Sequence, residues 1–567
     1  MLSKSWVKLP GRGAWRVALL IVAYVLVAVV MTWPYVNYSD FGGSTYGGDH
    51  RLIVWTLAWD NHAVLTQDTL FASNLFYPAP DSLKYNEHLF GVSLFTLPWA
   101  VAGASPVLAH NATWFLAFPL NGLMAFLLIR RFAGSALAAF VGSLAFTYSF
   151  YVMSHAHGHL HLIWLWPIPL SLWLLERWFD RPSVYRVGLW SAVVLLEALS
   201  SWYLAVLVLI ANGLLGVVLL VSVWPWRVSA ASGGRDPWLR RAAHLTGAAA
   251  VLGLCVFPFA RQYLHLTSSK GMVAANSADT ASYVVPPENT LIGRWWLQQG
   301  NDLPREIWGE QTLFAGWLVL AMAAIGLLVL LRRPKANPRA WFFLLLTVVT
   351  VALSYGSSLS VWGASWLAPF NWLAAVPGLD GFRAPARFAA LVMLGLSGLV
   401  GLGAAAFIRR QGTRGRVILV LLVPFMLLEW FVVDFPAGKP ESHRIPAIYK
   451  TPEVRTARSL VSLPDYQDMP DWFLGGDYLY YSTAHWRPIV NGFGRTTPPD
   501  HGEVLRVVRA FPESIPEMRG LGIQYVVLHA DRFADGAREI VKAAAGRSDC
   551  HLVRRIGSDY LFELSSS

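Results

Sequence analysis

The sequence predicts a polytopic α-helical membrane protein that carries a small α/β domain after its last span. Its 567 residues are 55% hydrophobic and have a mean hydropathy of +0.44. Only 14% of them are charged, whereas about a quarter of the residues in a soluble globular protein are charged. Water rejects so apolar a surface, but the hydrocarbon core of a bilayer accepts it. Composition therefore excludes a soluble enzyme, a disordered chain and a fibrous protein.

Eleven apolar runs are long enough to cross a bilayer, which takes about 20 helical residues. The first run, 17–33, follows a basic stretch and ends at Trp33-Pro34, where a signal peptide would need small residues for cleavage. We therefore expect an uncleaved first span. Two shorter stretches, 89–104 and 360–376, could cross, re-enter or lie in the interface. The other ten predicted spans are 107–130, 134–153, 160–179, 184–200, 202–224, 241–260, 312–332, 339–356, 386–408 and 416–434.

The basic residues are concentrated on one side of these spans. The N-terminal segment and the loops on its side of the membrane hold 21 Lys and Arg and three acidic residues. On the opposite side, loop 34–87 holds two basic and six acidic residues. Because Lys and Arg stay in the cytoplasm during insertion, we predict a cytoplasmic N-terminus and an extracytoplasmic C-terminal domain in the inner (cytoplasmic) membrane. The surplus on the cytoplasmic loops exceeds the net charge of +11. The basic charge thus indicates topology, and no nucleic-acid partner is expected.

The chain divides into two predicted domains. Residues 1–434 form the transmembrane domain, which includes an outer loop, 34–88, with interfacial helices. Residues 435–567 hold 16 basic and 16 acidic residues and form an extracytoplasmic α/β domain. In that domain 523–529 is typical of a buried strand, followed by a helix-like stretch to residue 545 and two short strands. Its balanced charges and nonspecific motifs predict that it does not carry the main catalytic base.

The polar loop after the first span holds the first candidate catalytic residue. Gly47 and Gly48 let the backbone turn tightly before Asp49, which would act as a general base. Glu87 or His88 would supply a second polar group, and His50 follows Asp49 directly. The alternative is structural, because Asp49 would also serve well as the cap of a helix that begins at His50. Spacing alone favours neither interpretation.

A run of histidines marks the predicted outer end of the third span. On a helix, His155 shares a face with His159, and His157 shares one with His161. This spacing suits a metal or a phosphate. No cysteine or clustered carboxylate completes a local ligand set, so no structural zinc site is expected. The alternative is a polar interfacial patch that merely ends the helix.

Ionisable residues near the outer ends of later spans complete the candidate site. An ionisable group inside a span is costly and usually functional, but Glu197 lies three residues from the end of its span and could simply reach water. Arg261, Arg383 and Arg387 place guanidinium groups at the same outer face. Arginine suits bidentate phosphate binding, and interfacial anchoring is the alternative.

The nature of the substrate follows from motifs that the sequence lacks. GxxxxGK[ST], GxGxxG, HExxH and CxxC are all missing, so no nucleotide cofactor is expected. Any chemistry would be extracytoplasmic, where nucleotide-activated donors are not found. A donor carried on a lipid is therefore the natural substrate.

Five short segments together resemble a known superfamily. They are Gly48-Asp49 in an acidic first loop, segment 74–80 (NLFYPAP), segment 382–388 (FRAPARF) opening a late span, and Tyr480-Tyr481-Ser482 with segment 488–492 in the tail. In this arrangement the chain resembles bacterial membrane glycosyltransferases of the GT-C superfamily, specifically the YfhO-like branch. The resemblance implies transfer of a sugar from a polyprenyl-phosphate carrier to an extracytoplasmic acceptor, which is a glycan, lipid or protein. It assigns the first-loop aspartate, here Asp49, to catalysis.

The mechanism that follows is a single displacement, which inverts the anomeric configuration. Asp49 would accept the proton of the attacking hydroxyl, and Arg261, Arg383 or Arg387 with the histidines would stabilise the departing phosphate. Glu87 and Glu197 compete for the role of a second acidic residue, and a divalent metal stays open. Two alternatives remain, a transporter or flippase of a lipid-linked substrate and a non-catalytic assembly scaffold. A transporter predicts broken helices and ionisable residues near the bilayer midplane, whereas the polar residues here lie mostly at outer ends.

Overall fold

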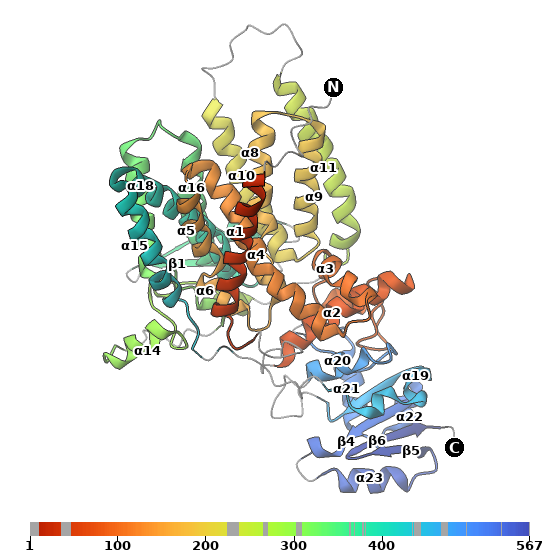
Figure 1. The fold of residues 1–567 in the computed structure, drawn as a ribbon. Coiled ribbons are helices and arrows are strands. Elements are labelled where there is room, and N and C mark those ends of the chain that lie inside the picture. The colour runs from red at the N-terminus through yellow and green to blue at the C-terminus, as the bar shows by residue number, and fades with distance from the viewer. Residues whose placement is uncertain are drawn as a thin grey trace. The chain divides into compact units, whose positions relative to one another are not determined.

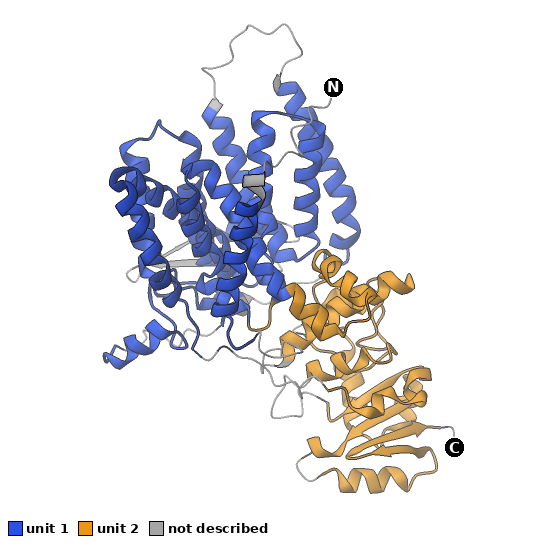
Figure 2. Cartoon of the chain, viewed as in Figure 1, with its two compact units in different colours: residues 1–36, 114–156, 160–435 blue, residues 37–113, 157–159, 436–567 orange. Residues whose placement is uncertain are grey.

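The computed structural model divides the chain into two compact units (Figure 2). The helical unit contains residues 1–36, 114–156 and 160–435, and the α/β unit contains 37–113, 157–159 and 436–567. The α/β unit thus joins the predicted outer loop to the C-terminal tail. The structure describes residues 11–35, 47–223, 237–264, 270–301, 309–361, 364–367, 369–376, 379, 382–433, 435, 444–465, 475–494, 496–533 and 536–565.

Helices occupy the positions of all eleven predicted spans (Figure 1). Four of the described helices are long and apolar enough to cross a membrane by themselves: 106–133, 202–222, 238–260 and 385–428. The number of crossings remains a prediction. The longer helices of the helical unit are α1 (Gly11–Met31), α4 (Pro106–Ala133), α5 (Ala136–Thr147), α8 (Pro167–Asp180), α9 (Val184–Ala198), α10 (Trp202–Val223), α11 (Pro237–Ala260), α15 (Trp317–Arg332), α16 (Trp341–Ser354) and α18 (Ala389–Leu428).

Two predicted spans are each built from two helices. Span 134–153 consists of α5 and α6 (Phe150–His155), and span 160–179 consists of α7 (Leu160–Ile163) and α8. Pro167 is the first residue of α8, where its missing N–H costs nothing and its fixed φ suits the helix. Short elements complete the unit: α12 (Lys270–Ala275), α13 (Thr280–Val284), α14 (Leu291–Gln298), η3 (Gly309–Gln311), η4 (Pro338–Ala340), β1 (Ser358–Val361), β2 (Ala364–Leu367), α17 (Phe370–Ala374) and η5 (Pro385–Phe388).

The central helix of the unit is α18, most of which is buried against α5, α15 and α16. It is two helices joined at Gly412, whose φ of 62° breaks the helical path. The two parts match the predicted spans 386–408 and 416–434. Glycines permit the close packing, because a Cβ on Gly326 of α15 would collide with the carbonyl group of Leu399. Small residues let helix backbones approach in this way in membranes.

We expect Gly326→Val to destabilise the helical unit. The side chain cannot fit without moving α15 away from α18, and overpacking of this kind costs about 1–3 kcal/mol or more. Thermal unfolding of the purified protein in detergent would measure the loss. Gly253→Val is the matched control, because a Cβ on Gly253 meets nothing within 4 Å. Equal stability of the two variants would contradict the packing argument.

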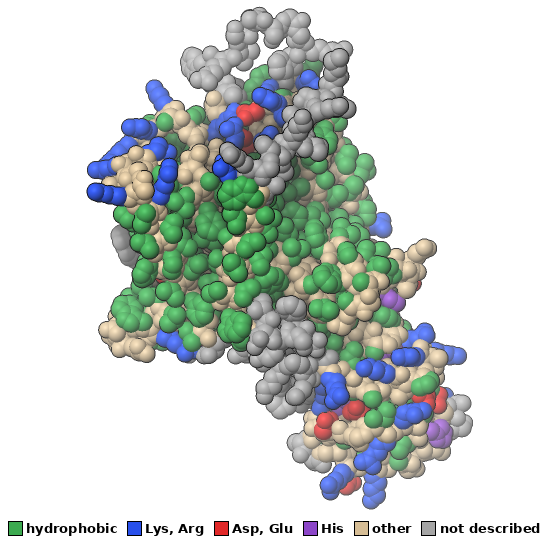
Figure 3. Space-filling view, in the orientation of Figure 1, with side chains coloured by type: hydrophobic (Ala, Val, Ile, Leu, Met, Phe, Trp, Pro, Cys, Tyr) green, Lys and Arg blue, Asp and Glu red, His purple; other side chains and the backbone are tan. Residues whose placement is uncertain are grey.

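The outer surface of the helical bundle is apolar. Figure 3 shows hydrophobic side chains covering the side of the bundle, with Lys and Arg gathered at one end. Leu254 of α11 and Phe425 of α18 are 77% and 63% exposed. Such surfaces are stable against lipid rather than water. The helical unit therefore has the surface of a membrane domain.

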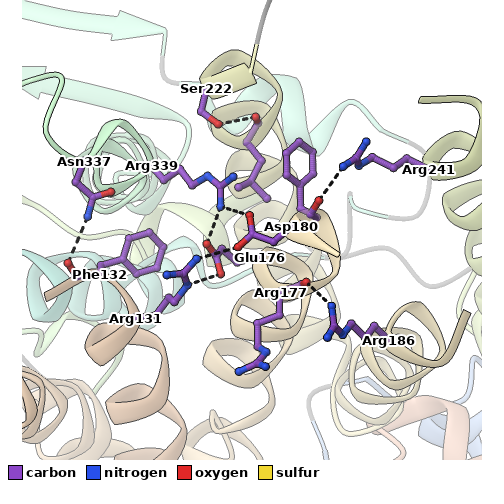
Figure 4. A network of polar contacts seen from close by, with 12 residues as sticks. Arg131, Phe132, Glu176, Arg177, Asp180, Arg186, Ser222, Arg241, Asn337 and Arg339 are labelled. Atoms are coloured by element: carbon purple, nitrogen blue, oxygen red, sulfur yellow. Dashed lines mark hydrogen bonds and ion pairs between the residues drawn. The ribbon is translucent and has the colours of Figure 1, made fainter. Parts of the chain in front are cut away.

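An ion-pair network joins three helix ends of this unit (Figure 4). Arg131 at the end of α4 contacts Glu176 and Asp180 of α8 at 2.9 and 2.8 Å. Arg339 of η4 contacts the same two carboxylates at 2.8 and 2.7 Å. The three loops that begin or end here were all assigned to the cytoplasmic side from their charge. The network places them on one side of the unit, and the orientation in the membrane remains a prediction.

The α/β unit contains a four-stranded sheet of order β3-β4-β6-β5. β3 and β4 are parallel, and the other pairs are antiparallel. The predicted strand 523–529 is β4, whereas the expected helix after it begins only at Arg538. The elements are α2 (Gly47–Thr66), η2 (Ser82–Tyr85), α3 (Phe90–Val101), η7 (Ala447–Lys450), α19 (Pro452–Thr456), β3 (Leu460–Leu463), α20 (Gly475–Ser482), α21 (His501–Arg509), α22 (Ile515–Gly520), β4 (Tyr525–His529), η10 (Ala530–Arg532), α23 (Arg538–Ala545), β5 (Cys550–Ile556) and β6 (Asp559–Leu564).

Neither of the two short apolar stretches forms a spanning helix in its described part. Stretch 89–104 forms α3, whose 12 residues extend only about 18 Å against a hydrocarbon core of about 30 Å. Stretch 360–376 contains the β1–β2 hairpin and the five-residue α17. In α3, Leu94 and Trp99 are exposed. This helix suits an interfacial position better than a crossing.

Candidate active site

Asp49 lies in the first turn of α2 and contacts a histidine from a distant segment. Helix α2 begins at Gly47, so the expectation that Asp49 caps a helix beginning at His50 is wrong. His159 Nε2 lies 3.3 Å from Asp49 Oδ2, and the two side chains are 32% and 45% exposed. The positive end of the α2 dipole favours a carboxylate at this position. The result is a carboxylate–imidazole pair that solvent can reach.

The histidine segment is not one helix, which corrects the expected i,i+4 pairing. Helix α6 ends at His155 and α7 begins at Leu160, with turn residues between them. Gly158, a poor helix former, lies against His50 of α2. His155 therefore contacts Glu310 in the helical unit, whereas His157 and His159 belong to the α/β unit.

The other loop candidates occupy different environments. His50 is buried with its ring 4.7 Å from that of His110. His88 is fully buried near Phe71, and burial lowers its pKa to about 3, so its imidazole is neutral. Glu87 is half-buried between η2 and α3. Among these candidates, His159 is the one whose contact with Asp49 is described above.

The helical unit holds a second polar cluster around Arg387 of η5. Arg387 Nε lies 2.9 and 3.1 Å from the two carboxylate oxygens of Glu310, and its Nη2 lies 2.5 Å from Oε1. His155 Nε2 lies 3.3 Å from Glu310 Oε2. The guanidinium carbon lies 4.0 Å from the ring centroid of Tyr203, a cation–π contact. Burial alone would raise the pKa of Glu310, but Arg387 and His155 together hold it well below its usual range.

Two buried polar side chains lie beside this cluster. Both carboxylate oxygens of Glu197 in α9 are buried and make no hydrogen bond with any described residue. The same holds for the hydroxyl of Tyr151 in α6. Tyr151 interacts electrostatically with Arg387, Glu310 and Glu197, so the four groups are neighbours. Glu197 therefore does not reach water near the end of its span, and buried polar groups of this kind need a functional or structural explanation.

The remaining arginine candidates lie apart from these contacts. Arg261 is exposed in the turn after α11. Arg383 is half-buried before η5, and its carbonyl oxygen accepts a 3.4 Å hydrogen bond from Asn276. Within the described residues, no group of three His, Cys, Asp or Glu side chains is arranged to hold a metal ion.

Sequence reasoning missed two acidic residues, Glu310 and Asp60. Glu310 lies in a three-residue η3, and its partner is 77 residues away, so no local pattern marks it. Asp60 is fully buried in α2, and burial raises its pKa well above the usual range, against a smaller opposing effect of a backbone hydrogen bond with Leu89. A lone acidic residue in the apolar face of α2 was the available signal.

We expect Asp60→Asn to stabilise the folded protein at neutral pH. The pKa of Asp60 is raised on folding, so the folded state binds the carboxyl proton more tightly than the unfolded chain does. The contribution of the Asp60 carboxyl to the free energy of unfolding is most favourable below the pKa of the unfolded chain, about 3.9. That contribution is lost as pH rises toward the pKa of the folded state. The gain in unfolding temperature should appear at pH 7 and disappear near pH 4. Thermal unfolding at both pH values measures it, and a gain independent of pH would contradict the assignment.

The sequence matches the model of a protein family over residues 70–430, which is more than half of the chain. The family is described as a domain of unknown function, DUF6311. The chain belongs to the DUF6311 family. The match covers α3, most helices of the helical unit and both residues of the Glu310–Arg387 pair. It does not bear on the YfhO-like branch. No curated protein matches this DUF6311 chain.

Two solved structures resemble this chain to different degrees. Arabinofuranosyltransferase AftD from Mycobacteria matches 98% of this chain with a TM-score of 0.60 and 13% sequence identity. The DUF6311 chain spans only 40% of the AftD chain. The oligosaccharyltransferase of Archaeoglobus fulgidus matches 93% of the chain and 70% of its own, with a TM-score of 0.49 and 12% identity. The AftD match shows that the DUF6311 chain shares its fold with part of the AftD chain.

Proposed function

We propose that this protein is a membrane glycosyltransferase that moves a sugar from a polyprenyl-phosphate carrier to an extracytoplasmic acceptor. The GT-C fold supports the reaction class. The observation that carries the proposal is the pair of Asp49 and His159, a half-exposed carboxylate in the first turn of a helix. The cytoplasmic N-terminus, the inner membrane and the YfhO-like affiliation belong to the same proposal.

Asp49 acts as the general base in this proposal. Its carboxylate accepts the proton of the acceptor hydroxyl while the hydroxyl oxygen attacks the anomeric carbon. His159 contacts Oδ2 and so orients the carboxylate. The carbon–oxygen bond to the carrier phosphate breaks in the same displacement, which inverts the anomeric centre. The polyprenyl phosphate leaves with the bonding electrons.

Arg387 binds the carrier phosphate in this proposal. Before the donor arrives, the Glu310 carboxylate occupies the position that the phosphate would take. A carboxylate and a phosphate both present two oxygens to the guanidinium fork. Glu310 already engages Arg387 in the bidentate manner that a phosphate would use, with Nε donating to Oε2 and Nη2 donating to Oε1. Tyr203 holds the guanidinium plane from one side. Exchange of Glu310 for the phosphate gives the leaving group its positive counter-charge.

Glu197 is the stronger of the two candidates for a second acidic residue. It is completely buried, and neither of its oxygens is hydrogen-bonded to a described residue. Glu87 is only half-buried in a loop. A carboxylate kept in an apolar span without a partner is costly, and such residues are usually retained for function. We therefore place Glu197 with Tyr151 beside the Arg387 cluster as a donor-side group.

The broken spans favour testing one competing function, a flippase or transporter of a lipid-linked substrate. Both α5–α6 and α7–α8 are interrupted, as that function expects. Purified protein in proteoliposomes would receive radiolabelled polyprenyl-phosphate sugars and an extract of acceptor glycans. Release of carrier phosphate with label in the acceptor supports transfer. Movement of intact donor between leaflets without label in the acceptor would overturn the glycosyltransferase proposal.

A further inference from the structure

A pocket of about 250 Å³ opens within the α/β unit, and neither Asp49 nor His159 is among its described lining residues. Helix α2 contributes Asn61 and His62, α3 contributes Thr96, and the segment after α20 contributes Thr483 and Trp486. Apolar side chains such as Leu57 fill the rest of the wall. A mostly apolar pocket with a few polar groups is typical of a small-molecule site.

Trp486 is held in this pocket in an unusual backbone conformation. Its φ is 56°, a left-handed value that is a genuine outlier for a bulky residue. Its ring stacks on the imidazole of His62 at a centroid distance of 4.4 Å and an angle of 14°. Trp59 packs against it at 5.9 Å. Strain of this kind persists only where the surrounding structure enforces it, and it is concentrated at functional sites.

The polar groups of the wall are uncharged. Asn61 Nδ2 donates to Thr96 Oγ1 at 2.8 Å, which fixes the orientation of both side chains. Amide, hydroxyl and imidazole groups offer donors and acceptors together. None of the described lining residues is Asp, Glu, Lys or Arg. The wall therefore suits a neutral ligand with several hydroxyl groups, and it lacks the cation that a phosphate or carboxylate ligand would need.

We propose that this pocket binds one neutral pyranose unit of the acceptor, with the Trp486 ring against its C–H face and the polar groups of Asn61 and Thr483 at its hydroxyls. An aromatic ring and an apolar wall cover the apolar face of a sugar ring, while amide and hydroxyl groups replace water at its edge. The volume suits a single sugar ring better than a peptide or a lipid chain. That the ligand is an acceptor rests on the proposed glycosyltransferase function, whereas sugar binding does not.

Ligand-observed NMR on the full-length protein in detergent tests the binding claim directly. The probes are methyl glycosides of neutral hexoses, with methyl glucuronide as the charged comparison. We expect saturation transfer from the protein to a neutral glycoside and roughly tenfold weaker binding in Trp486→Ala, since an aromatic contact is worth up to about 1.5 kcal/mol beyond its burial. Trp99→Ala removes an exposed tryptophan of α3 outside the pocket and should bind as the wild type does.

A second variant tests the pocket independently, in case Trp486→Ala does not fold. Ala58 of α2 lines the pocket, so Ala58→Phe fills it and leaves the contact of Trp486 with His62 in place. Unchanged glycoside binding in both variants, or binding of the charged glycoside only, would overturn the proposal. In transfer assays both variants should raise the acceptor KM about tenfold. If the wild type binds glycosides but transfers no sugar, the pocket stands and the proposed function fails.

Discussion

Replacing Asp49 by Asn is expected to lower the rate of sugar transfer by about 10²–10⁴-fold, the usual effect of losing a general base. The amide keeps the size of the side chain and its place in the first turn of α2, but it cannot accept the proton. The pair with His159 becomes at most a neutral hydrogen bond, so the free energy of unfolding should fall by no more than about 1 kcal/mol. Transfer from radiolabelled polyprenyl-phosphate sugar, with an unfolding curve on the same sample, measures both quantities.

Asp68→Asn is the matched control for this experiment. Asp68 follows α2 in the same unit, is 56% exposed and accepts a hydrogen bond from Thr66 at 2.6 Å. The same chemical change is thus made close to the same helix, without touching the proposed base. Asp68→Asn should transfer sugar at the wild-type rate. Near-wild-type turnover in folded Asp49→Asn protein would remove Asp49 from the mechanism and leave Glu197 and Glu87 as the next candidates.

The membrane helices could be predicted from the sequence because an apolar run is a local property. Every predicted span contains a helix, and the loops assigned together by charge meet in the network of Arg131, Glu176 and Arg339. The breaks were harder to predict. Pro167 marks the start of α8, but the interruption between α5 and α6 carries no proline or glycine. Only Tyr148 and Ser149 lie there, and Ser149 is the N-cap residue of α6, which is a weak signal inside an apolar run.

The candidate site could be predicted only residue by residue. Asp49 and His159 stand 110 positions apart, and the sequence supplied each separately without pairing them. The histidine run was interpreted as one helix because its spacing fits a helix, whereas Gly158 and the packing against His50 prevent it. Glu310 was not identified, because a single acidic residue in a loop gives no signal until the fold brings Arg387 to it. Long-range ion pairs are the part of a site that one sequence does not reveal.

Replacing Arg387 by Gln is expected to reduce kcat/KM for the lipid-linked donor by about 10²–10³-fold, the usual loss when a charge-stabilising group is removed. The same change leaves the Glu310 carboxylate with His155 alone in a largely buried site. Breaking one partner of a buried pair costs up to about 3–5 kcal/mol, so the single variant should also be unstable. Loss of activity in that variant alone would therefore not separate binding from folding.

The double variant Arg387→Gln with Glu310→Gln separates the two effects. It removes both charges, and replacing a whole buried pair is far less costly than breaking it, so stability should return while donor transfer stays low. Glu310→Gln alone keeps Arg387 and removes the group that competes with the phosphate, so the donor should bind at least as tightly as in the wild type.

Arg339→Gln is the matched control, since Arg339 pairs with the buried Glu176 in the ion-pair network of Figure 4. It should lose stability, and the folded fraction should transfer normally. If the stable double variant transfers at the wild-type rate, Arg387 does not bind the phosphate. If Glu310→Gln weakens donor binding as much as Arg387→Gln does, the role of Glu310 is to position Arg387 and not to occupy the phosphate site.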